Sequence, residues 1–320
     1  MIFELQNELI DLLLQQFPNG IVAFDLEMTG LSPAADQIVE LGAVKIDDKG
    51  ELQVLDFLID PLRPIPPKIT EIHGITNAMV EGKRNISEVM PKFLEFLGDL
   101  PLVAHNAQFD VGFLVHAIHR NNLSFSESEI FDSWLLARQV LKKRKSQNVE
   151  APDDYRLGTL AKFLDIPLDT HHRAYDDALA SLWIFGSCIK ILKQIGKLKD
   201  FPSKALLYHF DQFRKVENFE LPDQLEDLHE IIAKQEIIEI EYRGKSIKDR
   251  FRPIRPISFL PTPQGQVLYS LCVMSNMMKS FKVDKIKSWR RLPENQRTHW
   301  ENLITKTQEQ KKKQAATQKD

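Results

Sequence analysis

Two acidic residues stand two positions apart at the end of an apolar run, IVAFDLEMTG, which spans residues 21–30. In an extended chain, residues i and i+2 point to the same side, so Asp25 and Glu27 project from one face of the expected strand. Burying two like charges together is strongly unfavourable unless a cation lies between them. The pair therefore indicates a bound cation.

Three further acids stand at predicted helix starts. Asp110 follows the strand-like segment PLVAH, and Asp176 and Asp177 open the amphipathic segment AYDDALASLW. The free N–H groups and the dipole of a helix start favour a carboxylate, so each acid alone is also explained as a helix-terminal residue. Together with the first pair they could meet at the carboxyl end of one α/β sheet. Four carboxylates without a thiol or several histidines favour Mg²⁺ or Mn²⁺.

Three blocks of sequence resemble the motifs of the DnaQ-like 3'-5' exonucleases of the DEDDh type, which have a ribonuclease H-like fold. The blocks are FDLEMTGL, HNAQFDVGFL and HRAYDDA. Between them, in the family order, lie the segments IVELGAVKI, PIPPKITEIHGIT and LGTLAKFLDIP. The resemblance therefore covers residues 18–195. Spacing alone does not choose between Asp176 and Asp177, or between His171 and His172. The resemblance favours Asp177 and His172.

The resemblance implies a role for each matching residue. Four acids would bind two divalent cations, Mg²⁺ or Mn²⁺: Asp25, Glu27, Asp110 and Asp177. His172 would be the general base. The related subtype has a tyrosine four residues before its last aspartate, and it matches less well because Arg173 stands at that position. The terminal nucleotide is expected to contact the residues just after the first acid pair, namely Met28, Thr29 and Leu31. A simple strand-end turn around Gly30 is the alternative interpretation of that segment.

The pattern of residues 1–195 predicts the elements that would position these side chains. Residues 1–17 have the apolar spacing of a helix, and residues 18–195 would form the exonuclease domain. Three strand-like runs with a turn at 47–50 predict an antiparallel meander: IVAFDLEM, QIVELGAVKI and ELQVLDFLID. Helix and strand signals then alternate. The expected fold is α/β, a ribonuclease H-like mixed sheet flanked by helices.

The C-terminal third has a different pattern. Residues 196–228 are predicted to be a connector, and residues 229–291 a small β domain with one helix in front. This region resembles the WYL domain, a small Sm-like or SH3-like β-barrel, in IIAKQEIIEIEYRG, the RPI segments and KSFKVDKIKSW. The tripeptide that names the domain is not kept, because VLYSL matches it clearly only at Tyr269, and Lys285 stands where an arginine is common. Residues 292–320 are predicted to be a disordered basic tail.

Charge is distributed unevenly along the chain. Residues 231–297 hold 14 Lys and Arg against 6 Asp and Glu, although the whole chain has a net charge of −3. This asymmetry suggests that the acids hold metal and that the basic part contacts nucleic acid, unless the two parts are simply solvated surfaces of opposite sign. The candidate contacts to nucleic acid are Arg243, Arg250, Arg252, Arg255, Lys282, Lys285 and Lys287.

Composition also constrains localisation. We expect no membrane insertion because the chain lacks a run of 18 apolar residues, and its first segment carries acids where a signal peptide needs cations. Cys188 and Cys272 are far apart and have no neighbouring histidines or cysteines at zinc spacing. A cytoplasmic location is therefore expected.

The sequence thus predicts a metal-dependent 3'-5' exonuclease that hydrolyses phosphodiester bonds at 3' ends. Single-stranded DNA is the favoured substrate, because HGIT and HNAQFDVGFL resemble the proofreading epsilon subunits of DNA polymerase III. The alternative is an RNA exonuclease, because DLEMTGL is similar to oligoribonucleases. A regulatory protein that binds nucleic acid or another ligand is a second alternative, which the complete acid set disfavours. The expected partner is nucleic acid with a free 3' end, and a polymerase or repair partner stays open.

Overall fold

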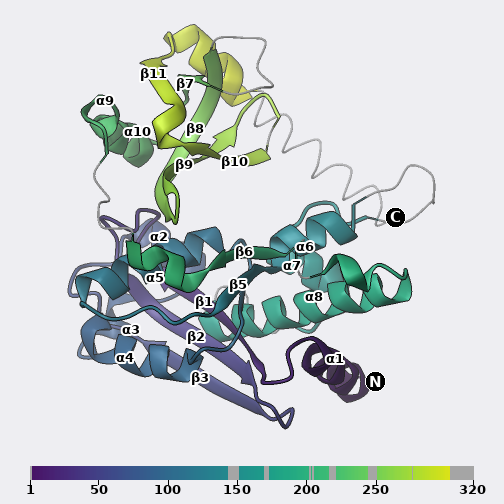
Figure 1. Ribbon diagram of the computed structural model, residues 1–320. Coiled ribbons are helices and arrows are strands. Elements are labelled where there is room, and N and C mark those ends of the chain that lie inside the picture. Colours follow the sequence, from purple (N-terminus) through teal and green to yellow (C-terminus); the bar gives the residue numbers. More distant parts are fainter. Residues whose placement is uncertain are drawn as a thin grey trace. The chain divides into compact units, whose positions relative to one another are not determined.

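The computed structural model describes residues 2–142, 151–168, 173–201, 203, 205–215, 221–243, 251–275 and 277–302. The chain divides into two compact units with separate hydrophobic cores (Figure 1). The first unit comprises Met1–Gly30 and Ala34–Arg214, and the second Leu31–Pro33 and Lys215–Asp320. Within these described ranges, no helix has the length and apolar character needed to cross a membrane.

The first unit is built on a six-stranded mixed sheet with the order β3-β2-β1-β4-β5-β6. Its strands are β1 (Ile21–Met28), β2 (Ile38–Ile46), β3 (Leu52–Leu58), β4 (Leu102–Ala104), β5 (Glu129–Asp132) and β6 (Leu206–His209). The first three form the predicted antiparallel meander, and β1, β4 and β5 pair in parallel. The predicted mixed α/β architecture is therefore confirmed. β6 lies in the segment that was predicted to be a connector, and it pairs with β5.

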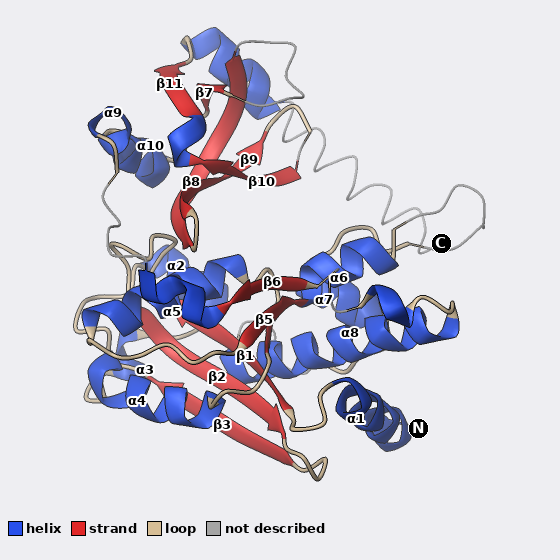
Figure 2. Ribbon diagram, in the orientation of Figure 1, coloured by secondary structure: helices blue, strands red, loops and turns tan. Residues whose placement is uncertain are grey.

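Helices cover both faces of this sheet (Figure 2). They are α1 (Ile2–Gln16), α2 (Pro67–His73), α3 (Asn77–Val80), α4 (Ile86–Leu97), α5 (Gln108–Arg120), α6 (Ser133–Val140), α7 (Leu157–Phe163) and α8 (Ala174–Gln194), with the short 3₁₀ helices η1 (Leu198–Asp200) and η2 (Phe210–Lys215). Phe93 of α4 packs edge-on against Phe24 of β1. Because neighbouring strand residues alternate in direction, Asp25 faces the opposite side, where α8 lies.

α8 is the central helix of the main core. Its side chains are buried on nearly the whole circumference, and Phe185 packs against Phe131 of β5 and Phe17 at the end of α1. A helix that is apolar on all sides must be enclosed by other elements, which here are the sheet, α1, α6 and α7. The direction of α8 is therefore set by packing along most of its length.

The first turn of α8 lies directly on β2 at a glycine. Gly42 pairs with Asp25 across the sheet. A Cβ atom on Gly42 would lie 2.2 Å from the carbonyl carbon of Ala174 and 2.3 Å from the backbone nitrogen of Tyr175. Only a residue without a side chain allows this approach.

The second unit contains a five-stranded antiparallel sheet with the order β10-β9-β8-β7-β11. Its elements are α9 (Asp223–Glu226), α10 (Leu228–Lys234), β7 (Ile238–Tyr242), β8 (Phe251–Thr262), β9 (Gly265–Cys272), β10 (Met277–Lys282), η3 (Val283–Lys285) and β11 (Ile286–Arg291). β10 and β11 are the edge strands, so the closed barrel stays a prediction. Residues 294–302, at the start of the predicted disordered tail, are helical, and residues 303–320 lie outside the described ranges.

Each unit carries one cysteine. Cys188 lies in α8 and Cys272 at the end of β9, and both are buried free thiols. Burial raises the pKa of Cys188 to about 12. The pKa of Cys272 is lowered, because hydrogen bonds from Ser275 and the charges of nearby cations outweigh its desolvation.

Replacement of Gly42 by alanine tests the close approach of α8. The added methyl group would overlap backbone atoms, which cannot move aside as a side chain can, so we expect a loss of about 1–3 kcal/mol in the free energy of unfolding. Urea unfolding measures this loss. Gly186→Ala in the middle of α8 is the matched control: its Cβ would meet side-chain atoms no closer than 3.5 Å, so stability should stay equal or rise. Equal stability of the two variants would contradict the described contact.

Candidate active site

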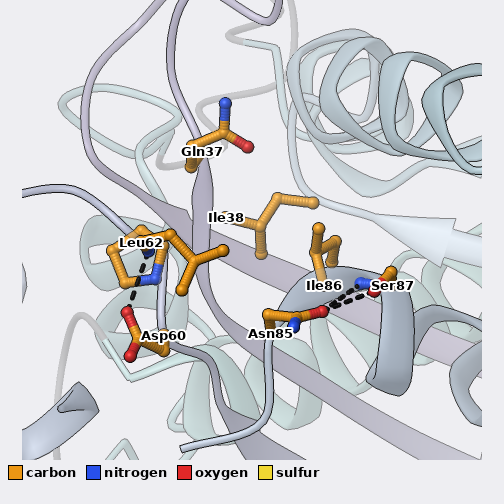
Figure 3. Close-up of a pocket in the computed structure, with 8 residues that line it drawn as sticks. Gln37, Ile38, Asp60, Leu62, Asn85, Ile86 and Ser87 are labelled. Atoms are coloured by element: carbon orange, nitrogen blue, oxygen red, sulfur yellow. Dashed lines mark hydrogen bonds between the residues drawn. The ribbon is translucent and has the colours of Figure 1, made fainter. Parts of the chain in front are cut away.

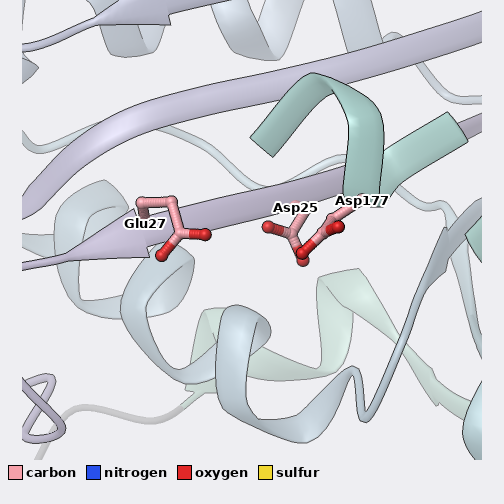
Figure 4. Close-up of side chains that lie close together, drawn as sticks. All are labelled: Asp25, Glu27 and Asp177. Carbon is pink, nitrogen blue, oxygen red and sulfur yellow. The ribbon is translucent and has the colours of Figure 1, made fainter. Parts of the chain in front are cut away.

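Three carboxylates from two elements meet beside β1, an interior strand of the first sheet. Asp25 and Glu27 project from β1, and Asp177 projects from the first turn of α8 (Figure 4). One carboxylate oxygen of each lies within 4.8 Å of the others. Asp177 is buried, whereas the other two are partly exposed. The structure therefore brings together acids that are about 150 positions apart in the sequence.

Asp110 lies beside this group. It belongs to the first turn of α5 and is buried. Burial is the main cause that raises the pKa of Asp25, and repulsion from Asp110 is the next. The four acids that the family resemblance assigns to metal binding are therefore close enough to interact.

Asp132 fixes the chain that leads into α5. Its buried carboxylate accepts hydrogen bonds from the backbone N–H groups of Asn106 (3.0 Å), Trp134 (2.9 Å) and Leu135 (3.2 Å). Asn106 has a φ of 60°, in the left-handed region that asparagine adopts more readily than most residues with a side chain. One carboxylate thus connects the turn before α5, the helix that carries Asp110, to the start of α6.

The acids of the site perturb one another strongly. Burial, reinforced by repulsion from Asp177, raises the pKa of Glu27 to about 8. Burial raises the pKa of Asp110 to about 8 as well, and that of Asp25 well above its ordinary value. At neutral pH this cluster therefore retains protons unless a cation replaces them.

The donor set fits hard divalent cations. All ligand atoms are carboxylate oxygens, and no cysteine or histidine among the described residues joins the group. Mg²⁺ and Mn²⁺ prefer such oxygen ligands, whereas Zn²⁺ is usually held by nitrogen and sulfur. The residues present are thus consistent with the divalent metal use of the family described below.

An ion pair behind the acids was not anticipated from the sequence. Glu40 of β2 is fully buried (0% exposed), and its Oε1 accepts hydrogen bonds from Nε (2.9 Å) and Nη2 (2.5 Å) of Arg173. Its Oε2 accepts a hydrogen bond from the backbone N–H of Ala174 at 2.9 Å. A charged residue within the apolar run IVELGAV is the signal that could have identified it.

The predicted nucleotide-binding residues have different surroundings. Thr29 is buried, and its hydroxyl accepts a hydrogen bond from the backbone N–H of Gln37 at 3.0 Å. Met28 is also buried, whereas Leu31 is 42% exposed. Of the three side chains, Leu31 is therefore the one that is accessible to a ligand.

The basic residues of the second unit do not form one uniform surface. The backbone N–H of Arg243 donates to the carbonyl of Lys285 (3.0 Å), and that of Lys282 donates to the hydroxyl of Tyr242 (3.2 Å). These contacts bring Arg243, Lys282 and Lys285 together, and all three are exposed. Lys287 instead pairs with Glu241 at 3.8 Å.

The remaining predicted residues are half-buried or lie outside the described ranges. Arg252 and Arg255 are half-buried, and the guanidinium of Arg252 lies over the Phe281 ring, 5.8 Å from its centroid. His172 belongs to residues 169–172 and Arg250 to residues 244–250, neither of which the structure describes.

A separate pocket of about 240 Å³ lies next to the start of α4. It is lined by Gln37, Ile38, Asp60, Pro61, Leu62, Asn85, Ile86 and Ser87 (Figure 3). Its Asn85 side chain caps α4 by accepting a hydrogen bond from the N–H of Ser87, and Asp60 accepts one from the N–H of Leu62. None of the four clustered acids lines this pocket, and its polar groups serve local structure.

A comparison with known protein families identifies the first unit. A family model described as an exonuclease, RNase T, matches residues 22–185. The chain belongs to this exonuclease family. Family membership confirms the predicted enzyme class, a nuclease.

Individual relatives are similar over different lengths. The PolC-type DNA polymerase III of Clostridium perfringens is 40% identical over 189 residues, which cover 58% of this chain and 12% of the relative. The PolC-type enzyme of Halalkalibacterium halodurans is 35% identical over 269 residues, which cover 83% of this chain and 16% of the relative. The chain thus spans less than a fifth of the length of either relative.

One solved structure shows the same fold. Escherichia coli exonuclease I in complex with a dT13 oligonucleotide is 14% identical and has a TM-score of 0.50. The match covers 80% of this chain and 55% of that chain. At this identity, the similarity supports the exonuclease fold of the chain and nothing finer.

The raised pKa values predict how stability depends on pH without metal. Between about pH 4 and 8 the folded protein binds more protons than the unfolded chain, because its carboxyl pKa values are the higher ones. Stability in EDTA should therefore fall as pH rises through this window. Thermal unfolding at about pH 5.5, 6.5, 7.5 and 8.5 measures this trend.

Addition of Mn²⁺ should raise the melting temperature more at the alkaline end, where the metal no longer competes with protons. Asp25→Asn is the control, since it removes one charge from the cluster with little change in volume. It should weaken both the pH dependence and the response to metal. A wild-type melting temperature that rises with pH in EDTA would contradict this account of the site.

Proposed function

We propose that this protein is a metal-dependent 3'-5' exonuclease that removes nucleotides from the 3' ends of DNA, preferably single-stranded. The observation that carries the proposal is the convergence of Asp25, Glu27 and Asp177 within 4.8 Å on a chain of the exonuclease family. Asp110 completes the set. Carboxylates held so close together destabilise the fold, so they are best explained by a function that needs them.

The proposed roles follow from the chemistry of phosphodiester hydrolysis. Asp25, Glu27, Asp110 and Asp177 would hold two divalent cations, Mg²⁺ or Mn²⁺, which supply electrostatic stabilisation of the charge that builds on the phosphate. His172 would take the proton from the attacking water, a role that suits a histidine near its ordinary pKa. Leu31 would contact the terminal nucleotide, with Met28 and Thr29 shaping the strand end beside it.

DNA is the proposed substrate because the relatives with the higher identities are DNA polymerases by name. The shared segment is a small part of those proteins, so a polymerase partner for this chain is a separate question. A comparison of the degradation of DNA and RNA oligonucleotides decides directly between the two substrates.

The second unit is proposed to be a WYL-like, Sm-like module that increases affinity for nucleic acid. Exposed cations surround the end of β7, where Arg243, Lys282 and Lys285 lie near Tyr242. Among the described residues, none of these three cations forms an ion pair with a carboxylate, so their charge is available to phosphate groups. Basic side chains beside an aromatic ring are typical of surfaces that bind single strands.

Activity assays on acid and histidine variants test the proposed nuclease. Oligonucleotides of DNA and RNA carrying a 3' or a 5' label should be shortened from the 3' end with Mg²⁺ or Mn²⁺ and remain intact with EDTA. Asp25→Ala and Asp177→Asn should abolish turnover, because each removes a proposed metal ligand. His172→Ala should lower kcat by about 10²-fold or more.

Asp176→Asn is the matched control for the proposed ligand Asp177. It removes the same charge from the neighbouring position of α8, and it should change turnover only a few-fold (about threefold or less, the scale of a lost surface charge). Equal losses in the two variants would argue against Asp177 as the specific ligand. Full, metal-independent activity of Asp25→Ala would exclude the mechanism.

Charge removal in the second unit tests its role in nucleic-acid binding. The double variant Lys282→Gln and Lys285→Gln should weaken binding of single-stranded DNA and lower the slope of log affinity against log salt by about 1–2, because fewer counterions are released. Fluorescence anisotropy at several salt concentrations measures both. Arg290→Gln is the control: Arg290 pairs with Glu239 at 2.6 Å and should contribute little. An unchanged slope in the double variant would remove this surface from substrate binding.

A further inference from the structure

We infer that Glu40 and Arg173 are positioning residues for the metal site: their buried ion pair holds the first turn of α8 on β2, so that Asp177 faces Asp25 and Glu27. The catalytic part of this inference rests on the proposed exonuclease activity. The structural part concerns the metal-free protein and can be tested without it.

Glu40 makes contacts that exclude it as a free metal ligand. Its Oε1 is occupied by two nitrogens of the Arg173 guanidinium, and its Oε2 by the N–H of Ala174. The carboxylate is completely buried, while the arginine side chain is 33% exposed. Glu40 is therefore a carboxylate like the four clustered acids, but its oxygens accept hydrogen bonds from Arg173 and Ala174.

The pair supplies the N-terminal cap that α8 lacks locally. Arg173 is the capping residue, and its side chain makes no capping hydrogen bond to its own helix. The free N–H of Ala174 instead donates a hydrogen bond to the carboxylate of Glu40, which belongs to β2. A carboxylate at a helix start satisfies an otherwise unpaired donor and interacts favourably with the helix dipole.

The capped turn leads directly to the metal ligand. The N–H of Asp177 donates to the carbonyl of Arg173 at 2.9 Å, so the two residues are one helical turn apart and move together. Gly42, two residues after Glu40 in β2, leaves the space in which this turn lies. Gly42 permits the close approach of the turn to β2, and the ion pair holds the turn in that position.

Charge explains why the cap must be an ion pair rather than a lone carboxylate. Glu40 is close enough to repel the charges of Asp25 and Glu27, so an unpaired Glu40 would increase the repulsion within the cluster. The Arg173 guanidinium compensates it, and it also lies near the carboxylates of Asp56 and Asp176. Removing only the cation from a buried pair destabilises the fold more than removing both charges.

The test is a double-mutant cycle with Glu40→Gln, Arg173→Gln and the combined variant, read by two measurements. Hydrogen exchange of the metal-free protein reports protection of the α8 first turn, residues 174–178. Steady-state kinetics at saturating Mn²⁺ report kcat and KM. We expect each single variant to lose at least about tenfold protection in this turn and about 10- to 100-fold in kcat, with KM changed less than about threefold.

The combined variant should be no worse than Arg173→Gln alone, because it leaves no buried charge uncompensated. Arg173→Lys keeps the charge but loses the two-nitrogen contact, so it should recover part of both readouts. The matched control is Glu8→Gln, which removes the ion pair between Glu8 of α1 and Lys190 near the other end of α8 (2.7 Å). This control should leave kcat and the first-turn exchange unchanged.

The outcomes separate the inference from the proposed function. Unchanged kcat in Glu40→Gln, or exchange that rises equally throughout the first unit, would overturn the positioning role and leave an ordinary structural ion pair. Independent losses that add up in the combined variant would also overturn it. If the wild-type protein cleaves no substrate, the proposed function fails, and the exchange data still decide whether the pair holds the α8 turn.

Discussion

The burial of neighbouring carboxylates is the constraint on which the first unit depends. Asp25, Glu27, Asp110 and Asp177 are removed from most of the solvent and face one another, and the pKa of three of them is raised mainly by burial. Such an arrangement opposes folding, so the surrounding structure has to supply the compensating stability. The extensive apolar core around α8 is the source of that stability.

Each acid-bearing element is held by contacts that do not use the side chains of the proposed metal ligands. β1 is paired on both sides, with β2 and with β4. The turn into α5 is held by Asp132, and the first turn of α8 by Glu40. Two buried carboxylates thus serve as caps for backbone N–H groups, next to the four that are proposed to bind cations.

Features with a local cause could be predicted from the sequence. The alternation of a strand is enough to place Asp25 and Glu27 on one face, and the turn at 47–50 is enough to predict the meander. The strand β6 was missed because its four residues, LLYH, lie in a mixed polar segment and pair only through tertiary contacts. The partner of Glu40 was missed for a related reason: Arg173 is 133 positions away, and no local pattern links the two. The choice of Asp177 over Asp176 likewise needed the family resemblance, because both begin the same helix.

The placement of one cysteine in each unit has a consequence for chemical labelling. The thiolate is the reactive form of cysteine, and Cys188, with a pKa of about 12 inside α8, offers almost none of it in the folded state. Cys272 is buried too, and the contacts that lower its pKa belong to the folded unit, so its thiol becomes an ordinary cysteine once that unit opens. Alkylation of either residue therefore requires its own unit to open, so the chain contains a natural reporter of local unfolding for each unit. Mass spectrometry of the two cysteine peptides would follow the opening of both units in one sample, without any introduced probe.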